Sequence, residues 1–177
     1  MKDFLKKLKL VDYLVTELEI SQHDFVNRLS ASVDEGSVGM FFNSFEAFSS
    51  SKNEFKGHVG LYDFKIRRRR RFFDMNMNLA VASGTFEQRG NFLRINTEIN
   101  GFMGMIVPFY VLLIVFYSVF VILFLTADDV EGNMDFIALP FIIIHAAFMF
   151  GVPYFMMRRS VSKMKHELDR EFYYLTK

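Results

Sequence analysis

The densest group of chemically active side chains is the run Arg67 to Arg71, with Lys65 two positions before it. Guanidinium and ammonium groups donate hydrogen bonds to phosphate and carboxylate oxygens, so the run predicts anion binding. Three interpretations fit: a solvated strand end, nucleic acid stacked on Phe72 and Phe73, or anionic lipid headgroups. Residues 1–101 hold 15 basic and 13 acidic groups, a balance that disfavours nucleic acid.

Catalytic and metal-binding patterns are missing from the sequence. The four histidines stand at positions 23, 58, 145 and 166, with no pair at zinc-ligand spacing. There is no glycine-rich phosphate loop and no hydrolase or zinc-protease motif. The chain has no cysteine, which excludes a thiolate nucleophile and a disulfide framework. We therefore expect no enzyme, no catalytic residue, no metal site and no cofactor.

Two long stretches carry no Asp, Glu, Lys or Arg, and they predict membrane spans at 102–126 and 136–157. Helices of these lengths would measure about 37 and 33 Å, against a hydrocarbon core of about 30 Å. Together they form a predicted transmembrane hairpin over 101–157, joined by an external loop at 127–135. His145 is the ionisable group inside these two spans, either functional or bonded to a neighbouring helix carbonyl. The small residues Ala147 and Gly151, four positions apart, would let another helix approach closely.

The charges that flank the spans predict their orientation. The loop at 127–135 holds four acidic residues and no basic one, whereas residues 158–177 hold six basic residues. Short flanks rich in Lys and Arg stay in the cytoplasm, so both termini should be cytoplasmic. We expect a multi-pass protein of the bacterial inner (cytoplasmic) membrane.

The first hundred residues predict a small cytoplasmic α+β domain. Positions 12–20 have the alternation of a strand. Ser21 is a helix N-cap for the stripe Phe25, Leu29 and Val33. A second short helix would carry the phenylalanines at positions 41, 45 and 48.

Residues 54–100 alternate throughout, which predicts an antiparallel meander of four or five strands with a hairpin at Gly90-Asn91. Its last strand ends at Gly101, where the first span begins, so that end must meet the membrane. Its hairpin partner is antiparallel and therefore starts at that end. The strand before the partner, which holds Lys65, is antiparallel again and therefore ends there as well. This geometry favours the lipid interpretation, with predicted headgroup contacts at Lys65, Arg67, Arg68, Arg69, Arg70, Arg71, Arg158 and Arg159.

The segment 158–177 predicts a cytoplasmic amphipathic helix, because apolar residues recur at spacings of three and four. Its stripe needs a partner, either the sheet or the same helix of another copy. The stripe consists of Val161, Met164, Leu168, Phe172 and Leu175.

The order strand, helices, antiparallel strands, long final helix resembles the helix-grip arrangement of START-like ligand-binding domains. In this chain a membrane hairpin would be inserted before the last helix, and five or six strands are evident where that fold has seven. The whole chain also resembles uncharacterised bacterial membrane proteins with two transmembrane helices and an N-terminal sheet domain. That likeness is carried by Phe55-x-Gly57, Phe64-x-Ile66-x-Arg68, Gly84-x-Phe86 and Gly90-Asn91, and it implies no particular activity.

The sequence thus predicts an α+β membrane protein: a small antiparallel-sheet domain at 1–100, a transmembrane hairpin and a C-terminal amphipathic helix. We expect a non-enzymatic scaffold or pore-type subunit that self-associates and whose domain contacts anionic lipid or a protein partner. The alternative is a membrane-tethered domain that binds a small ligand or lipid. The expected partners are membrane lipids and further copies of the chain, with a protein partner as a further option.

Overall fold

The computed structural model describes residues 2–39, 53–69, 79–126 and 134–177. The chain divides into two compact units, one made of Met1–Phe102 with Met157–Lys177 and the other of Met103–Met156. Three predicted features lie outside the described residues: the helix at positions 41–48, the side chains of Arg70 to Phe73, and most of the loop at 127–135.

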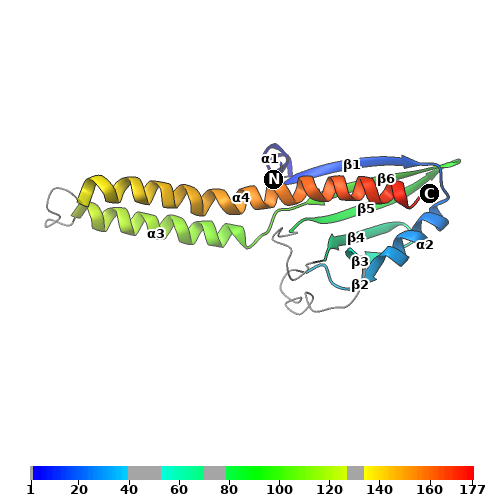
Figure 1. The fold of residues 1–177 in the computed structure, drawn as a ribbon, viewed down its shortest axis with the longest axis horizontal. Coiled ribbons are helices and arrows are strands. Elements are labelled where there is room, and N and C mark those ends of the chain that lie inside the picture. The colour runs from blue at the N-terminus through cyan, green and yellow to red at the C-terminus, as the bar shows by residue number, and fades with distance from the viewer. Residues whose placement is uncertain (1, 40–52, 70–78, 127–133) are drawn as a thin grey trace. The chain divides into compact units, whose positions relative to one another are not determined.

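The first unit is α+β, with one six-stranded mixed sheet (Figure 1). Its spatial order is β1-β6-β5-β4-β3-β2. All neighbouring strands are antiparallel except β2 and β3, which are parallel. The strands are β1 (Val11–Leu18), β2 (Val33–Glu35), β3 (Phe55–Val59), β4 (Asp63–Arg68), β5 (Val81–Arg89) and β6 (Phe92–Asn100).

The parallel pair corrects the prediction of a purely antiparallel sheet. The helix α2 (Gln22–Ser32) ends one residue before Val33, so Val33 begins β2 and does not belong to the helical stripe. Parallel strands cannot be joined by a tight turn, and residues 36–54 give β2 and β3 the long connection that they need. A strand of three residues at a sheet edge is too short to leave an alternation in the sequence.

Local signals that set element ends are confirmed. The Ser21 hydroxyl accepts a hydrogen bond from the backbone N–H of Asp24 at 3.1 Å and caps α2. The β5–β6 hairpin turns at Gly90, whose φ of 59° is the left-handed conformation that glycine favours. A short helix, α1 (Lys2–Lys7), precedes β1 and was not predicted, because six residues are too few to show a helical period.

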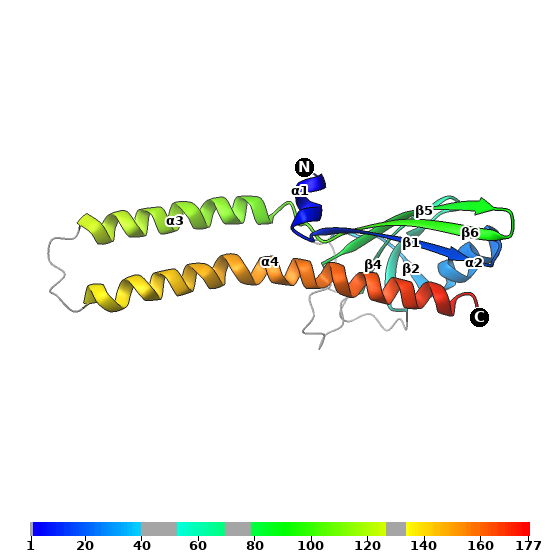
Figure 2. The ribbon, with the colours of Figure 1, turned by 90° about the horizontal axis from the view of Figure 1, so that it is seen from above.

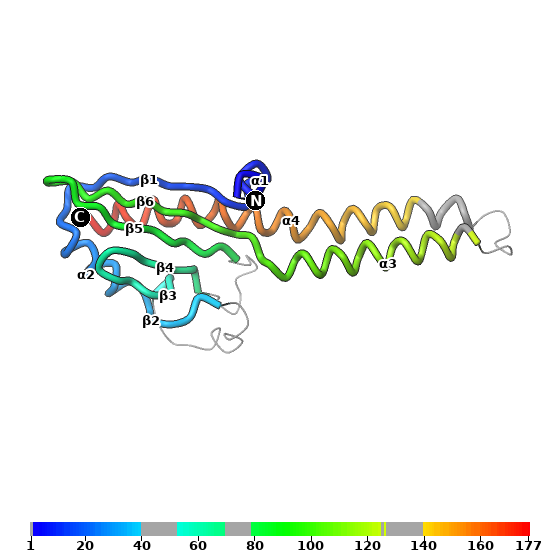
Figure 3. Tube along the Cα trace, turned by 180° about the vertical axis from the view of Figure 1, so that it is seen from behind, coloured from blue at the N-terminus to red at the C-terminus, as the bar shows by residue number. Residues whose placement is uncertain are grey.

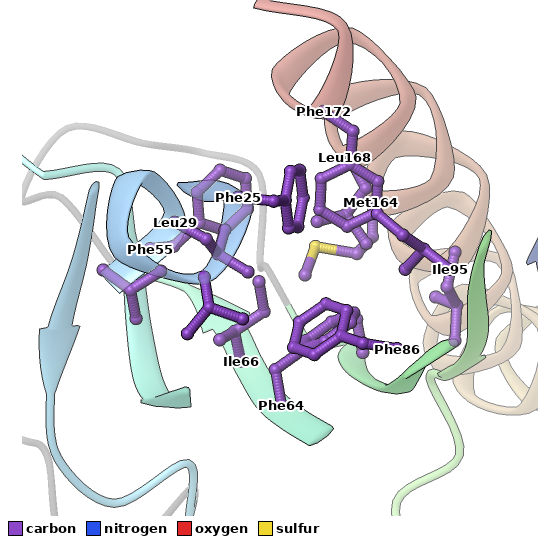
Figure 4. Packing of buried hydrophobic residues seen from close by; sticks show 14 of the residues in the cluster. Phe25, Leu29, Phe55, Phe64, Ile66, Phe86, Ile95, Met164, Leu168 and Phe172 are labelled. Carbon is purple, nitrogen blue, oxygen red and sulfur yellow. The ribbon is translucent and has the colours of Figure 1, made fainter. Parts of the chain in front are cut away.

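The core lies on one face of the sheet, where α2 and the C-terminal part of α4 (Met134–Tyr174) cover it (Figures 2 and 4). Phe25 from α2 meets Phe172 from α4 edge-to-face, with ring centroids 5.5 Å apart. Phe64 of β4 stacks on Phe86 of β5 and also meets Phe172. The stripe at 161, 164, 168 and 172 is buried in this core, so the sheet of its own chain is its partner.

Two contacts fix the ends of the C-terminal segment of α4 within the first unit. At its start, Gly101 lies so close that an added Cβ would be 2.5 Å from Val161 Cγ2 and 3.0 Å from the Met157 carbonyl oxygen. At its end, Arg28 of α2 donates a hydrogen bond to the Leu175 carbonyl oxygen at 2.7 Å, so the C-terminus lies near α2 (Figure 3). Glycine at position 101 is therefore required by the close approach of β6 to the helix.

The second unit holds α3 (Ile106–Thr126) and the N-terminal part of α4. Both α3 and α4 are long and apolar enough to cross a membrane. The helix α3 begins four residues after the predicted start of the first span, which shortens it to 21 residues. The second predicted span and the amphipathic segment are one continuous helix of 41 residues, with Pro140 and Pro153 inside it.

Candidate functional site

The strand β4, which holds Arg67 and Arg68 and is called the arginine strand below, ends level with the last residue of β6. Arg67 pairs with Val81, Val81 pairs with Asn100, and Asn100 pairs with Val11. Asn100 is the last residue of β6 before the chain continues to α3. The end of β4 is therefore level with the end from which the chain leaves the sheet, which is the arrangement that the alternation pattern predicts.

Arg68 lies against two carboxylates. Its guanidinium forms an ion pair with Glu167 of α4 and lies 3.7 Å from Glu54. Lys163, one helical turn before Glu167, lies 3.8 Å from the same carboxylate. The sequence gives no sign of this cluster, since 99 positions separate Arg68 from Glu167.

Burial raises the pKa of Glu167 above its ordinary value. Arg68 and Lys163 act in the opposite direction, and the nearby Glu54 adds to the increase. One carboxylate oxygen of Glu167, Oε2, is buried with no hydrogen-bond partner among the described residues. A carboxylate that is only half satisfied is costly to keep ionised, which explains why burial prevails over the ion pairs.

The two neighbouring arginines are also buried. Arg69 forms an ion pair with Asp34 of β2, and Asn53 donates a second hydrogen bond to the same carboxylate at 2.9 Å. Arg67 is 3% exposed, and its guanidinium lies 3.5 Å from the Arg68 carbonyl oxygen. A headgroup role for these three arginines stays a prediction, and it now has to compete with carboxylates inside the domain.

The remaining predicted headgroup residues differ in their exposure. Lys65 is exposed on the sheet face opposite the core, since it alternates with the buried Phe64 and Ile66. Arg159 is exposed, and Arg158 is half-buried. Arg70 and Arg71 lie outside the described residues.

In the second unit His145 has a side-chain partner from the other helix. Its Nδ1 atom lies 2.6 Å from the Tyr117 hydroxyl of α3, and the Phe141 ring stacks on its imidazole. A second cross-helix bond follows, from the Tyr110 hydroxyl to the Phe150 carbonyl oxygen at 2.8 Å. His145 thus bonds to a tyrosine and not to the backbone carbonyl that the sequence offered as its alternative.

The small pair Ala147 and Gly151 stays on the surface of the second unit. Ala147 is exposed, and a Cβ added to Gly151 would meet nothing closer than the Phe155 ring at 3.8 Å. The predicted packing residues of the C-terminal segment lie in the first unit instead, where Leu175 packs at the border of the core. Close approach of another helix to Gly151 is thus sterically open.

Metal binding finds no support in the described residues. Among them, no group of three or more His, Asp or Glu side chains is placed to hold a metal ion. No protein-family model, no curated protein and no solved structure matches the chain. The function must therefore be argued from the geometry of this chain alone.

Proposed function

We propose that the chain is a non-enzymatic integral membrane protein whose hairpin anchors an anion-binding α+β domain to the bilayer. The observation that carries this proposal is the exposure of α3. Leu112, Ile114 and Val115 point to different sides of the helix, and each is more than half exposed. A helix that is apolar all round and unburied needs lipid or other chains around it. At about 1.5 Å per residue, α3 also matches a hydrocarbon core of about 30 Å.

Both ends of the chain belong to one side of that membrane. The first unit combines residues before the hairpin with residues after it, and Phe172 packs on Phe25 and Phe64 in a common core. This core supports the even number of crossings that a hairpin requires. The acidic loop and the basic tail favour the cytoplasm as the side of the domain, and we place the protein in the bacterial inner membrane.

The domain then lies where anionic headgroups are available to its exposed basic residues. Each basic residue near an anionic leaflet contributes about 1 kcal/mol of attraction. Lys65 and Arg159 are exposed and free to take part, as candidates for this contact. We further propose that the chain self-associates as a scaffold through the open surface around Gly151.

Cysteine labelling tests the anchoring, because the natural chain has no cysteine that would interfere. Gly132→Cys places one thiol in the loop, and Ser83→Cys places one on the exposed face of β5. In bacterial cells with a permeabilised outer membrane, an impermeant maleimide should label Gly132→Cys. Ser83→Cys should react only after the inner membrane is disrupted.

The converse labelling pattern would contradict the orientation. Extraction of the chain from membranes by alkaline carbonate would contradict membrane insertion itself, since an integral hairpin resists that treatment.

A further inference from the structure

A basic cavity of about 410 Å³ lies in the α+β unit, away from the arginine strand. It is lined by residues of α1, the α1–β1 connection, β1 and the first turns of α4 that belong to this unit. Its charged lining consists of Lys6, Lys9, Arg158, Lys165 and Asp12. The sequence predicts Arg158 as a headgroup contact but offers no reason to group it with Lys6 and Lys9, which precede it by some 150 positions.

The cations are unevenly engaged. Lys165 is paired with Asp12 at 2.8 Å, and the Lys6 ammonium lies over the Tyr13 ring at 5.3 Å. Within the part of the chain that the structure describes, the side chains of Lys9 and Arg158 have no hydrogen bond or ion pair. Two cations without a counter-ion thus face one cavity.

Asp12 does not neutralise this lining. Burial on its own would raise the pKa of Asp12, but the Lys165 ammonium, the Tyr13 N–H and the Lys6 charge lower it by more. The net pKa lies below the ordinary value, so Asp12 is ionised at neutral pH. With four cations and one carboxylate, the lining keeps a formal charge of +3.

We propose that this cavity binds a phosphate group, and, resting on the proposed membrane function, that the phosphate belongs to an anionic phospholipid headgroup. A guanidinium presents parallel N–H donors that match two phosphate oxygens, and ammonium groups supply point charges to the others. The Ser162 hydroxyl adds a neutral donor, and buried Val11 and Val161 give the cavity an apolar floor. A free phosphate ion has the same chemistry, so the test must separate the two sources.

The backbone at Lys9 is the second observation. The helix α1 ends in a Schellman motif, in which Leu10 N–H donates to the Leu5 carbonyl and Lys9 N–H donates to the Lys6 carbonyl. The residue at this turn has φ of 57°, a left-handed conformation in which glycine is usual and a lysine is strained. Lysine at position 9 thus lowers the stability of the turn relative to glycine, but it places a cation at the cavity.

The position of the cavity agrees with a headgroup. Val11 pairs with Asn100 at the end of the sheet, and Gly101 N–H donates to the Leu10 carbonyl oxygen at 2.9 Å. Only four residues separate Gly101 from the first residue of α3, and Arg158 follows the last residue of the other unit by two positions. One connection to the proposed spans thus contributes Arg158 to the lining, and the other begins at Gly101, which bonds to Leu10 next to the lining residue Val11.

The experiment uses the full chain in neutral detergent micelles. The probes are inorganic phosphate, dioleoyl-phosphatidylglycerol and zwitterionic dioleoyl-phosphatidylcholine, with dissociation constants from native mass spectrometry and from the rise in melting temperature. We expect one phosphatidylglycerol per chain to bind more tightly than phosphatidylcholine. Lys9→Gly and Arg158→Gln should each weaken that binding by roughly tenfold, the equivalent of one charge-assisted hydrogen bond.

Matched variants separate the cavity from general charge and from misfolding. Arg89→Gln removes one positive charge at the hairpin end of the sheet and should leave binding unchanged. Lys9→Gly should at the same time raise the melting temperature by about 2–4 °C, because glycine relieves the strained turn. Asp12→Asn should tighten binding, since it removes the one negative charge of the lining and releases Lys165.

Each outcome decides the question. Binding by phosphatidylglycerol that inorganic phosphate cannot displace supports the lipid, and displacement by phosphate supports a free phosphate ligand in the same cavity. Parent affinity in Lys9→Gly and Arg158→Gln, or an equal loss in Arg89→Gln, overturns the proposal. The cysteine labelling is independent of these results, so the cavity can fail while the membrane anchoring stands.

Discussion

Glu167 joins the last helix to the arginine strand at the scale of single residues. It faces Arg68 and Lys163, yet burial raises the pKa of its carboxyl. The ion pair therefore contributes little net stability, because desolvation of a buried carboxylate offsets the attraction. Its main effect is to specify which residues of the helix and the strand come into contact. Arg68 also approaches Glu54, so it keeps a counter-ion if Glu167 is neutralised.

This residue gives a pH prediction with a definite sign. A carboxyl whose folded-state pKa is raised stabilises the fold fully below its ordinary pKa of 4.5, and that contribution is lost as the pH rises through the raised value. The unfolding free energy of the parent relative to Glu167→Gln should therefore fall from pH 4 to pH 7, measured by thermal unfolding in neutral detergent. Asp169→Asn, on the exposed side of the same helix, is the matched control for the loss of one carboxylate. A relative stability that rises with pH would contradict the raised pKa.

Residue patterns of short range could be predicted, and pairs of long range could not. The N-cap at Ser21 could be predicted because Ser21 and the N–H group that it binds are only three positions apart. The Arg68–Glu167 pair and the presence of Lys9 and Arg158 in the lining of one cavity depend on how strands and helices pack. Charge alone does not say which acidic residue a basic residue will contact. For that reason the anion site at the arginine run stays a prediction, whereas its internal carboxylate partners were missed.

At the scale of elements, the C-terminal segment of α4 is fastened to the sheet by a buried hydroxyl as well as by its apolar stripe. The Ser160 hydroxyl accepts hydrogen bonds from the N–H groups of Leu79 and Ala80, both at 2.8 Å. These two residues precede β5 directly, where no neighbouring strand satisfies them. One side chain thus terminates the sheet ladder and positions the helix.

Ser160→Ala should destabilise the first unit by about 1–3 kcal/mol, because two buried N–H groups would lose their acceptor. The measurement is urea unfolding of the full chain in detergent, with tyrosine fluorescence as the signal. Ser162→Ala, two positions on and exposed, should change the unfolding free energy by less than about 0.5 kcal/mol. Equal stability of both variants would show that the helix does not depend on this bond.

Element types followed from periodicity wherever an element was long enough to repeat. The strands β4 and β6 and the helix α2 alternate or recur over several turns, and these were predicted. The three residues of β2 and the six of α1 carry no period. The position of β2 depends on its pairing at the edge of the sheet, and the end of α1 depends on the Schellman motif. Both features exist only in the folded chain.

At the scale of the whole molecule, self-association is the part of the proposal that depends on more than one copy. The helix surface at Gly151 has room for a Cβ, which would come no closer than 3.8 Å to the Phe155 ring. Gly151→Leu should therefore leave the chain folded while it hinders close approach of a second helix.

Native mass spectrometry in lipid nanodiscs checks this prediction. We expect the parent to be an oligomer and Gly151→Leu to raise the monomer fraction roughly threefold or more. Val152→Leu, one position along the same helix, should keep the distribution of the parent. A parent that is monomeric throughout would contradict self-association, and the membrane anchoring would be unaffected.

The discontinuous make-up of the α+β unit sets an order on biosynthesis. Phe25, Phe64 and Phe86 leave the ribosome long before Leu168 and Phe172, which complete their core from beyond the hairpin. Until the final helix emerges on the same side as the sheet, these aromatic side chains stay uncovered and open to chaperones and proteases. Under the proposed anchoring, a chain whose second span fails to insert would leave this core open. Completion of the domain would then serve as a check that the membrane segment has been inserted correctly.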